Sequence, residues 1–533
     1  MDYKFPELPD PKLRGQGPIS EWYKGRSIFI TGATGFMGKV LLEKLLYQSE
    51  VERVYILIRS KRGRFPHQRI EDMWKLPMFH RCRKDCPEVL NKIVPLYGDV
   101  ITKNFGLTVE DRKLLIDNVS VVFHCAATLK LEAELKDAIE MNTEGTQKVL
   151  ELAREMKKLD VFVHLSTAFC SADIDELEEK IYPTPDNPSD VIQVVKWMSR
   201  DALVQATPAI LKHHPNTYTY SKRLAETLVA DEYPKLPVVV ARPSIVTPAS
   251  IEPLPGWVDS LNGPMGIVVG GGKGVIRSVH AIPENRAQVV PVDVAISALI
   301  VIAWKMGSAT VKPPTIPVYN LTNDGAKRMT WGDILQKGKR IGHKYPFETM
   351  IWYPDGDIRP SKFRHDVCCF FYHWIPAYLI DFLMLIFRQK RFMVRLQKKI
   401  HFGLELLQFF TTREWIFKSE NFLNLTSDMT PTDRQAYPMD FNAMPVEDYF
   451  TITYLGARQY LMKEDLSTIP RWRIIQNILY VVDRAFALAF YFGLIWLLCQ
   501  CSHTVKDAFD LVGSYLQQVP VLGMLIPISE KNH

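Results

Sequence analysis

Residues 26–48, RSIFITGATGFMGKVLLEKLLYQ, indicate the fold of the first half of this chain. This stretch begins with a short run of β-branched and aromatic residues, continues with glycines at every third position, and ends with apolar residues at helical spacing. This order predicts a strand, a tight turn and a helix. Gly32, Gly35 and Gly38 would let a pyrophosphate approach the backbone amides at the helix N-terminus. The stretch therefore favours a dinucleotide site over a plain glycine-rich turn.

A second apolar strand is predicted at residues 53–60, and the residues at its end indicate which dinucleotide binds. In an NAD site an acidic residue usually stands here and binds the ribose hydroxyls. This chain instead has Arg59, followed by Lys61, Arg62 and Arg64. Because Arg59 and Arg62 would attract a 2′-phosphate, we expect NADPH as the cofactor. A solvated basic loop is the alternative interpretation.

Other residues of the first half complete the predicted cofactor site. Thr34 and Phe36 lie in the glycine-rich turn, beside the expected pyrophosphate. Two further predicted strands end near Asp99 and near the small pair Ala126 and Ala127. Ligands of open α/β sheets lie at the carboxyl ends of the strands, so we expect these residues to meet the cofactor. The alanines would leave room for its ribose.

The segment PNTYTYSKRLAE, residues 215–226, contains the candidate proton-transfer residues. On a helix, side chains four positions apart share a face, so Tyr218 can meet Lys222 while Tyr220 points away. A tyrosine and a lysine at this spacing are common in helices and indicate little by themselves. Because they follow the glycine-rich turn and a strand that ends in hydroxyl residues, we favour a catalytic pair.

These residues fit the chemistry of carbonyl reduction by a hydride. Negative charge develops on the substrate oxygen, which must be stabilised and then protonated. We expect Tyr218 to donate the proton, and Lys222 to lower the pKa of this tyrosine and bind the cofactor ribose. A hydroxyl from the strand end HLST would hold the substrate oxygen, and we prefer Thr167 to Ser166 for this role.

The composition of the 533-residue chain is that of a globular protein, with 47% hydrophobic residues and a net charge of only +6. This modest charge, together with the lack of a known nucleic-acid-binding motif, argues against a nucleic-acid partner. The N-terminus lacks a signal-peptide pattern, so we expect the bulk of the chain in the cytosol. The eight cysteines have no metal-ligand spacing, and we expect buried free thiols and no metal site.

Three segments suggest a covered, membrane-bound site. The acidic, proline-rich residues 173–190 precede the candidate tyrosine, and we interpret them as part of a cover over the substrate, with a surface excursion as the alternative. Cys368–Phe387 is apolar but contains Asp381, so we expect it to lie on the membrane beside basic residues, with a buried core helix as the alternative. Ala485–Cys501 has no charged residue and predicts a membrane span, and residues 519–528 form a further apolar patch.

The motifs TGATGFMG, STAFC and YTYSK resemble those of the extended short-chain dehydrogenase/reductase superfamily. Residues 241–246, 255–278, 406–417 and 441–464 are similar to stretches of the alcohol-forming fatty acyl-CoA reductases, most of all to insect members. The resemblance covers nearly the whole chain. It is specific because several separate stretches agree in the same order.

That resemblance implies a four-electron reduction. Two NADPH would convert a long-chain or very-long-chain acyl-CoA through an aldehyde into a primary alcohol, with release of CoA. The residues alone indicate only an NADPH-dependent carbonyl reductase. Reduction of another lipid carbonyl, release of the aldehyde, or a non-catalytic protein that binds cofactor or lipid therefore remain as alternatives.

The predicted fold is α/β, with a Rossmann-type, doubly wound parallel sheet, a mainly helical C-terminal domain and a C-terminal membrane segment. We expect an N-terminal extension over residues 1–25, the NADPH-binding catalytic domain over 26–350, a C-terminal reductase domain over 351–470, and a membrane anchor with its tail over 471–533. The expected partners are an acyl-CoA and membrane lipid. The resemblance favours the endoplasmic reticulum membrane with a cytosolic catalytic domain, and a peroxisomal or lipid-droplet membrane is the alternative.

Overall fold

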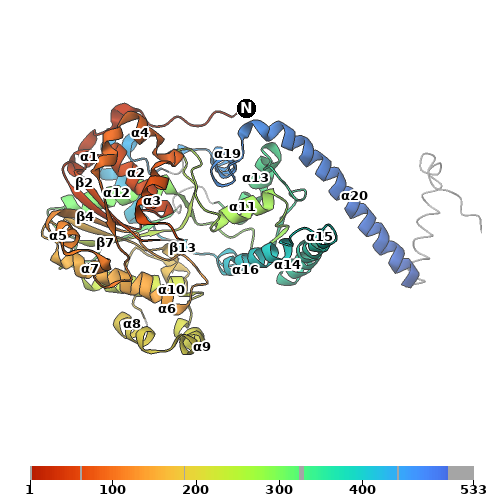
Figure 1. Cartoon of the computed structure of the whole chain (residues 1–533), viewed down its shortest axis with the longest axis horizontal. Coiled ribbons are helices and arrows are strands. Elements are labelled where there is room, and N and C mark those ends of the chain that lie inside the picture. The colour runs from red at the N-terminus through yellow and green to blue at the C-terminus, as the bar shows by residue number, and fades with distance from the viewer. Residues whose placement is uncertain (1–2, 61–62, 185, 323–328, 441–442, 502–533) are drawn as a thin grey trace, which may run out of the picture.

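A computed structural model describes residues 3–60, 63–184, 186–322, 329–440 and 443–501 of the chain. Figure 1 shows a sheet covered by helices at one end of the molecule and a second group of helices beside it. The long helix α20 (Ile469–Cys501) extends from this second group, away from the sheet.

Seven parallel strands form the main sheet in the order β11-β7-β5-β4-β1-β2-β3. The strands are β1 Ser27–Thr31, β2 Arg53–Ile58, β3 Ile93–Tyr97, β4 Val119–His124, β5 Val161–Leu165, β7 Val238–Pro243 and β11 Val318–Leu321. The strand order reverses between β1 and β4, and ligands of doubly wound sheets bind at such a switch point. The predicted Rossmann-type parallel sheet is confirmed.

Helices cover both faces of the sheet and form two cores. Along β1, Ile28 and Ile30 pack into one core and Phe29 into the other, because successive side chains of a strand point to opposite faces. The helices of the first core are α1 Gly17–Tyr23, α2 Phe36–Gln48 and α12 Val292–Ser308. Those of the second are α5 Val109–Asn118, α7 Gly145–Glu155 and α10 Thr217–Asp231.

The C-terminal half is mainly helical, as predicted. Its helices include α13 Trp331–Lys344, α14 Lys362–Cys369, α15 Ile375–Ile386, α16 Met393–Thr411, α18 Pro431–Ala436 and α19 Val446–Gly456, and the π-helical turn η7 Phe370–Trp374 joins α14 to α15. This half also returns to the sheet domain, since Phe422 and Tyr437 are buried in the first core. The strands β6 (Glu176–Leu177) and β13 (Ile416–Phe417) pair with each other and join the two halves a second time.

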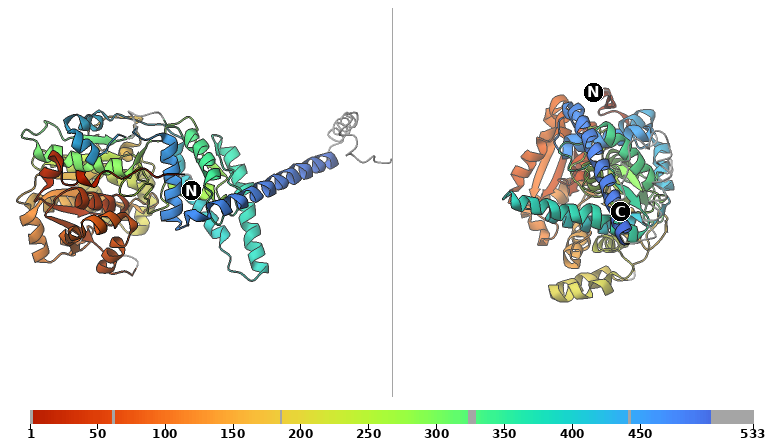
Figure 2. Two further views of the ribbon diagram at one scale, coloured as in Figure 1. Left: turned by 90° about the horizontal axis from the view of Figure 1, so that it is seen from above. Right: turned by 90° about the vertical axis from the view of Figure 1, so that its right-hand side faces the viewer.

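Two helical runs are long and apolar enough to cross a membrane, namely Lys362–Ile386 and Leu466–Leu497. Only 17% and 6% of their most apolar windows are buried, so neither is a helix of the protein core. Cys368–Phe387 is therefore not fully buried in the core, although one of its faces, with His373 and Ala377, is buried. Figure 2 shows α20 projecting from the rest of the chain. The apolar patch at residues 519–528 lies outside the described residues.

Candidate functional site

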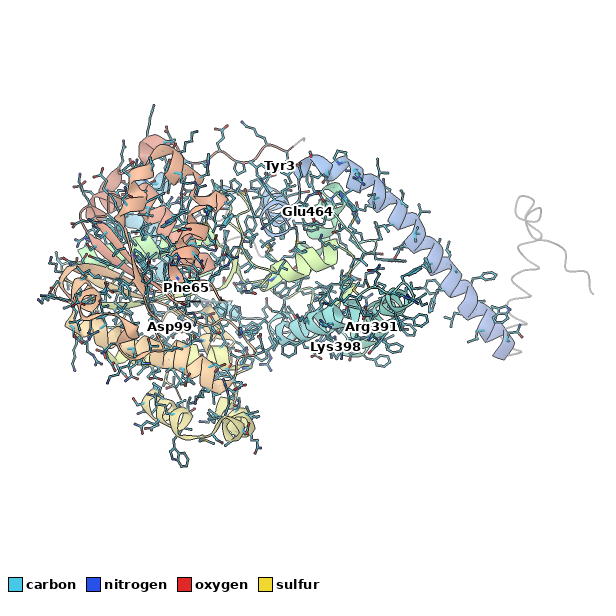
Figure 3. All side chains as sticks on the ribbon, viewed as in Figure 1. Tyr3, Phe65, Asp99, Arg391, Lys398 and Glu464 are labelled. Carbon is cyan, nitrogen blue, oxygen red and sulfur yellow. The ribbon has the colours of Figure 1, made fainter. Side chains whose placement is uncertain are left out.

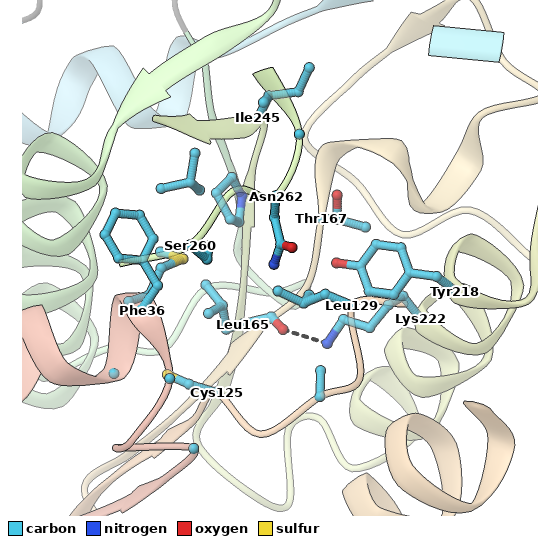
Figure 4. A pocket seen from close by; sticks show the side chains of 18 of the residues that line it. Phe36, Cys125, Leu129, Leu165, Thr167, Tyr218, Lys222, Ile245, Ser260 and Asn262 are labelled. Carbon is cyan, nitrogen blue, oxygen red and sulfur yellow. Dashed lines mark hydrogen bonds between the residues drawn. The ribbon is translucent and has the colours of Figure 1, made fainter. Parts of the chain in front are cut away.

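The carboxyl edge of the sheet opens into a cavity of about 450 Å³ between the glycine-rich turn and α10. Figure 4 shows Phe36 on one side of this cavity and Thr167, Tyr218 and Lys222 on the other. The predicted site residues that line it are Gly32, Thr34, Gly35, Phe36, Gly38, Arg59, Asp99, Ala126, Ala127, Ser166, Thr167, Tyr218 and Lys222. Arg62 lies outside the described residues. The fold thus brings together residues that are far apart in the sequence.

The glycine-rich turn has no room for side chains at two positions. Gly32 has a φ of +76°, and a Cβ atom there would lie 2.7 Å from the amide nitrogen of Ala126. A Cβ atom on Gly38 would lie 2.2 Å from the carbonyl oxygen of Gly32. Gly35 caps α2, whose first amides consequently face the cavity. This backbone cradle at a helix N-terminus fits the pyrophosphate of a dinucleotide.

Two arginines stand beside this turn. Arg59 donates from Nη1 to Asp99 Oδ2 over 3.1 Å. Arg69, on α3 (Pro66–Trp74), donates from Nη2 to Thr34 Oγ1 over 2.7 Å and from Nη1 to the carbonyl oxygen of Arg59 over 2.5 Å. Sequence reasoning did not identify Arg69, because only the packing of α3 returns it to the cavity. Among the described residues, no carboxylate forms an ion pair with Arg69.

The loop after β4 is tied to the helix that contains Lys222. Asn142 donates from Nδ2 to the carbonyl oxygen of Thr128 over 3.2 Å and to Ser221 Oγ over 2.9 Å. Its Oδ1 accepts from the Thr128 amide over 2.8 Å. Asn142 lies in a π-helical turn, a feature that is frequent at functional sites. Sequence reasoning missed this residue, because no periodic pattern reveals a π-helical turn.

Helix α10 presents one of its two neighbouring tyrosines to the cavity. The side chain of Asn216 caps its N-terminus, and Tyr218 and Lys222 then follow on the cavity face. Tyr220 lies on another face, where its hydroxyl donates to Asp186 Oδ2 over 3.0 Å and the ring is 1% exposed. The helical spacing had predicted this separation of the two tyrosines.

Burial determines the protonation state of Tyr218. It raises the pKa of the phenol above its ordinary value, against the opposing hydrogen bond with Thr167. Lys222 donates its Nζ proton to the carbonyl oxygen of Leu165 over 2.6 Å. The expected lowering of the Tyr218 pKa does not appear as a net shift, because desolvation of the phenolate outweighs any lowering by a neighbouring ammonium. Tyr218 is therefore protonated at neutral pH, which is the form that can donate a proton.

The charge of Lys222 should impose a pH dependence on the reaction. Burial lowers the pKa of this ammonium to about 8, although the Glu226 carboxylate opposes the shift. If Tyr218 gives up a proton to a substrate, the Lys222 ammonium would stabilise the phenolate, and this stabilisation would be present below the lysine pKa and lost above it. The single-turnover rate of oxidation of a nicotinamide cofactor is then expected to fall roughly tenfold per pH unit above about pH 8.

Lys222→Arg provides the control for this profile, because an arginine stays charged over the whole range. The variant should be slower but should lose the alkaline decline. A wild-type rate that stays constant up to about pH 10 would show that the charge of Lys222 is not required.

A buried ion pair lies behind the cavity face of α10. Arg242 donates from Nε to Glu226 Oε1 over 2.8 Å and from Nη2 to Oε2 over 2.6 Å, with both residues at most 2% exposed. Burial raises the pKa of Glu226, but Arg242 holds it below the ordinary value. Thr167 is the hydroxyl beside Tyr218, whereas Ser166 Oγ is buried with no hydrogen-bond partner among the described residues.

The cavity is covered by helices that follow residue 260. Met265 on α11 (Pro264–Gly272), Trp331 on α13 and Phe410 on α16 line it, whereas no described residue between 171 and 217 does so. The prediction that residues 173–190 form a cover is therefore wrong. In this segment Asp173 Oδ1 and the Pro183 carbonyl oxygen accept hydrogen bonds from Arg223 of α10 over 2.7 and 2.9 Å, so the acidic stretch packs beside α10 instead.

Asn262, just before α11, is a further residue that sequence reasoning did not single out. Figure 4 shows its carboxamide in the part of the cavity that contains Tyr218 and Thr167. A carboxamide offers both a donor and an acceptor to a ligand in such a position. The sequence marks this segment only through a family resemblance, and the packing of α11 brings the Asn262 side chain to the cavity.

Comparisons with known proteins agree with this architecture. Residues 30–299 match the NAD-binding part, and residues 372–464 the Sterile part, of the family described as male sterility protein. Fatty acyl-CoA reductase wat of Drosophila melanogaster is 34% identical over 86% of this chain and 88% of its own length. Fatty acyl-CoA reductase 2 of Mus musculus is 34% identical over 93% of this chain and 96% of its own length.

A solved structure shares the fold. It is the reductase domain of a nonribosomal peptide synthetase from Mycobacterium tuberculosis, with a TM-score of 0.55 at 18% identity over 86% of this chain and 94% of that chain. The NAD-binding match, the reductase relatives and the glycine-rich turn together make this protein an oxidoreductase with a nicotinamide cofactor. The chain belongs to the fatty acyl-CoA reductase family.

Proposed function

We propose that the protein reduces a long-chain or very-long-chain acyl-CoA to the primary fatty alcohol, with NADPH as reductant and an aldehyde as intermediate. The observation that carries this proposal is that Tyr218, Lys222 and Thr167 line one cavity with both the glycine-rich turn and apolar side chains. The names of the two relatives supply acyl-CoA as the substrate class.

The bound nicotinamide supplies the hydride, and residues of the chain manage the substrate oxygen. Thr167 and Tyr218 hold the thioester carbonyl oxygen, and Tyr218 gives it a proton as negative charge develops there. Lys222 stabilises the resulting phenolate. The hemithioacetal then breaks its carbon–sulfur bond to give the aldehyde and CoA. A second reduction by the same residues gives the alcohol, so two NADPH and two protons are consumed for each CoA released.

The apolar wall of the cavity suits an acyl chain. Leu129, Met265, Leu407 and Phe410 contribute to this wall, and they come from different parts of the fold. Burial of a methylene in such a place stabilises a bound chain by about 0.8 kcal/mol. Figure 4 shows Thr167, Tyr218 and Lys222 together at one side of the cavity, where they can meet the reactive carbonyl while the chain contacts the apolar residues.

Arg69 supports NADPH as the cofactor. Its guanidinium lies beside Thr34 and Arg59, at the strand end where an NAD site has a carboxylate. Since a charge-assisted hydrogen bond contributes about 1.5–3 kcal/mol, Arg69→Ala should raise the Kd for NADPH roughly 10- to 100-fold and leave that for NADH almost unchanged. Fluorescence titration with both cofactors measures this ratio.

Arg64 provides a matched control for this substitution. Arg64 belongs to the basic stretch that follows β2, but it pairs with Asp72 at the surface and does not line the cavity. Arg64→Ala should leave both dissociation constants unchanged. An equal loss of NADPH and NADH affinity in Arg69→Ala would refute a role in binding the 2′-phosphate.

Product analysis tests the proposed reaction. The detergent-extracted full chain is given NADPH and saturated acyl-CoAs of increasing length, and the NADPH oxidised is compared with the CoA released. A ratio of two with alcohol as product supports the proposal. A ratio of one with free aldehyde as product would support the same active site in an aldehyde-forming enzyme. Tight NADPH binding with no turnover on any chain length would reject an acyl-CoA substrate.

We also propose that α20 anchors the protein in the endoplasmic reticulum membrane, with the catalytic domain in the cytosol. Its exposed apolar part follows Arg471, Arg473 and Arg484, and basic residues favour the cytosolic side. Asp483, which interrupts the apolar sequence, is 7% exposed and accepts from Arg277 over 3.2 Å, so its charge lies against the protein. Protease protection and co-localisation with organelle markers distinguish this compartment from peroxisomes and lipid droplets.

A further inference from the structure

The helical run from α14 to α15 has one attached face and one exposed apolar face. On the attached face, the His365 ring contacts Ser278 Oγ over 2.8 Å and His373 Nε2 accepts from the Arg277 amide over 2.8 Å. The outer face is formed by large apolar side chains that are all more than a third exposed. They include Phe363, Phe370, Phe371, Tyr378, Leu379, Phe382, Leu383, Leu385, Ile386 and Phe387.

This face and α20 lie side by side. The rings of Phe371 and Phe490 are 6.3 Å apart, which places the π-helical turn against α20. Arg277 joins the two elements, because its amide donates to His373 and its Nη1 pairs with Asp483 of α20. The left view of Figure 2 shows the run and α20 on the side of the molecule away from the sheet. A membrane into which α20 inserts would therefore also contact this apolar face.

Asp381 lies on α15, but it does not interrupt the apolar face. Its carboxylate binds the first amides of α16 and so closes the turn between the two helices. Its carboxylate accepts from the amides of Phe392, Met393 and Val394 over 3.1, 2.8 and 3.1 Å. A carboxylate is stabilised at a helix N-terminus in this way. The run therefore turns back through residues 387–392, which is the geometry of a hairpin lying on a surface and excludes a continuous span through α16.

Basic residues surround the turn of this hairpin. Arg388, Lys390, Arg391, Arg395, Lys398 and Lys399 are exposed. Within the described parts of the chain, none of them belongs to an ion pair. Figure 3 shows Arg391 and Lys398 on the side that contains α14 and α15. Between α15 and α16, a cleft of about 590 Å³ combines Tyr378, Phe382 and Leu385 with Lys390, Arg391 and Arg395.

We infer that the hairpin formed by residues 362–411 lies on an anionic bilayer, with the apolar face of α14 and α15 among the acyl chains and the basic residues at the lipid phosphates. An apolar helix face bordered by lysine and arginine is typical of such interfacial binding. The inference rests on the proposed membrane anchoring and adds a second contact with the membrane, the strength of which depends on the charge of the lipids. The last turn of α16 lines the catalytic cavity, so this hairpin also connects the membrane surface with the site.

Photo-crosslinking of the full chain in vesicles tests the inference. Benzoylphenylalanine is placed at Phe382 on the hairpin, at Leu488 on α20, or at Trp197 on α8 (Pro188–Trp197), which are 57%, 71% and 87% exposed. The vesicles contain radiolabelled phosphatidylcholine, with or without phosphatidylserine. Positions 382 and 488 should label lipid and position 197 should not. Phosphatidylserine should increase labelling at 382 roughly fivefold or more, since each basic residue near an anionic surface contributes about 1 kcal/mol, and should leave 488 unchanged.

The triple substitution K390Q/R391Q/R395Q should abolish this dependence on phosphatidylserine at position 382 and leave labelling at 488 intact. Retained NADPH oxidation in each variant shows that the chain is folded. Labelling at 488 with none at 382 would overturn the inference and preserve the anchor. Labelling at neither position would overturn both, whatever the reaction products are.

Discussion

Tyr218→Phe should lower kcat by about 10²–10⁴-fold, because the variant keeps the ring and loses the proton that the reduced substrate oxygen must receive. Burial keeps the wild-type phenol protonated at neutral pH, and its hydroxyl lies beside Thr167 in the cavity. Single-turnover NADPH oxidation measures this loss. The affinity for NADPH, measured by fluorescence titration, should stay within about twofold, since the hydroxyl binds substrate.

Tyr220→Phe is the matched control, because it removes the same atom two residues further along the same helix. That hydroxyl donates to Asp186 and lies outside the cavity, so its loss should lower the free energy of unfolding by about 1 kcal/mol and leave kcat nearly unchanged. If Tyr220→Phe abolished turnover and Tyr218→Phe did not, the assignment of the proton donor would be reversed.

Glu226→Ala should lower the free energy of unfolding by about 3–5 kcal/mol, because it leaves the guanidinium of Arg242 buried without its partner. Arg242 is 0% exposed and donates two hydrogen bonds to this carboxylate. The shift of Tm in detergent measures the loss. Turnover should fall as well, since Glu226 also favours the charged form of Lys222.

Two comparisons isolate the buried charge as the cause. The double variant Glu226→Met with Arg242→Met leaves no charge in the core and should recover much of the lost stability. Asp366→Ala breaks the exposed pair with Lys362 and should change the free energy of unfolding by at most about 1 kcal/mol. Equal losses in Glu226→Ala and the double variant would show that packing, and not the unpaired charge, is responsible.

Short stretches of sequence predict those elements whose residues are close neighbours in the chain. The glycines at every third position predict the turn between β1 and α2, because Gly32 needs a positive φ and Gly38 must fit under the Gly32 carbonyl. The spacing of Tyr218 and Lys222 predicts their shared face, because the helix repeat places residues four apart together. These features depend on local backbone geometry, which a short stretch specifies.

Tertiary packing determines which residues that are distant in the sequence come into contact. Arg69 reaches Thr34 only through the packing of α3, and the cavity is covered by α11 and α16 although residues 173–190 lie nearer in the sequence. The protonation of Tyr218 likewise depends on burial, which no spacing records. In the sequence, Asp381 interrupts an apolar run, and only the structure shows that its carboxylate accepts hydrogen bonds from the α16 amides. Such contacts follow from the packing of separate elements, and periodicity along the chain contains no information about them.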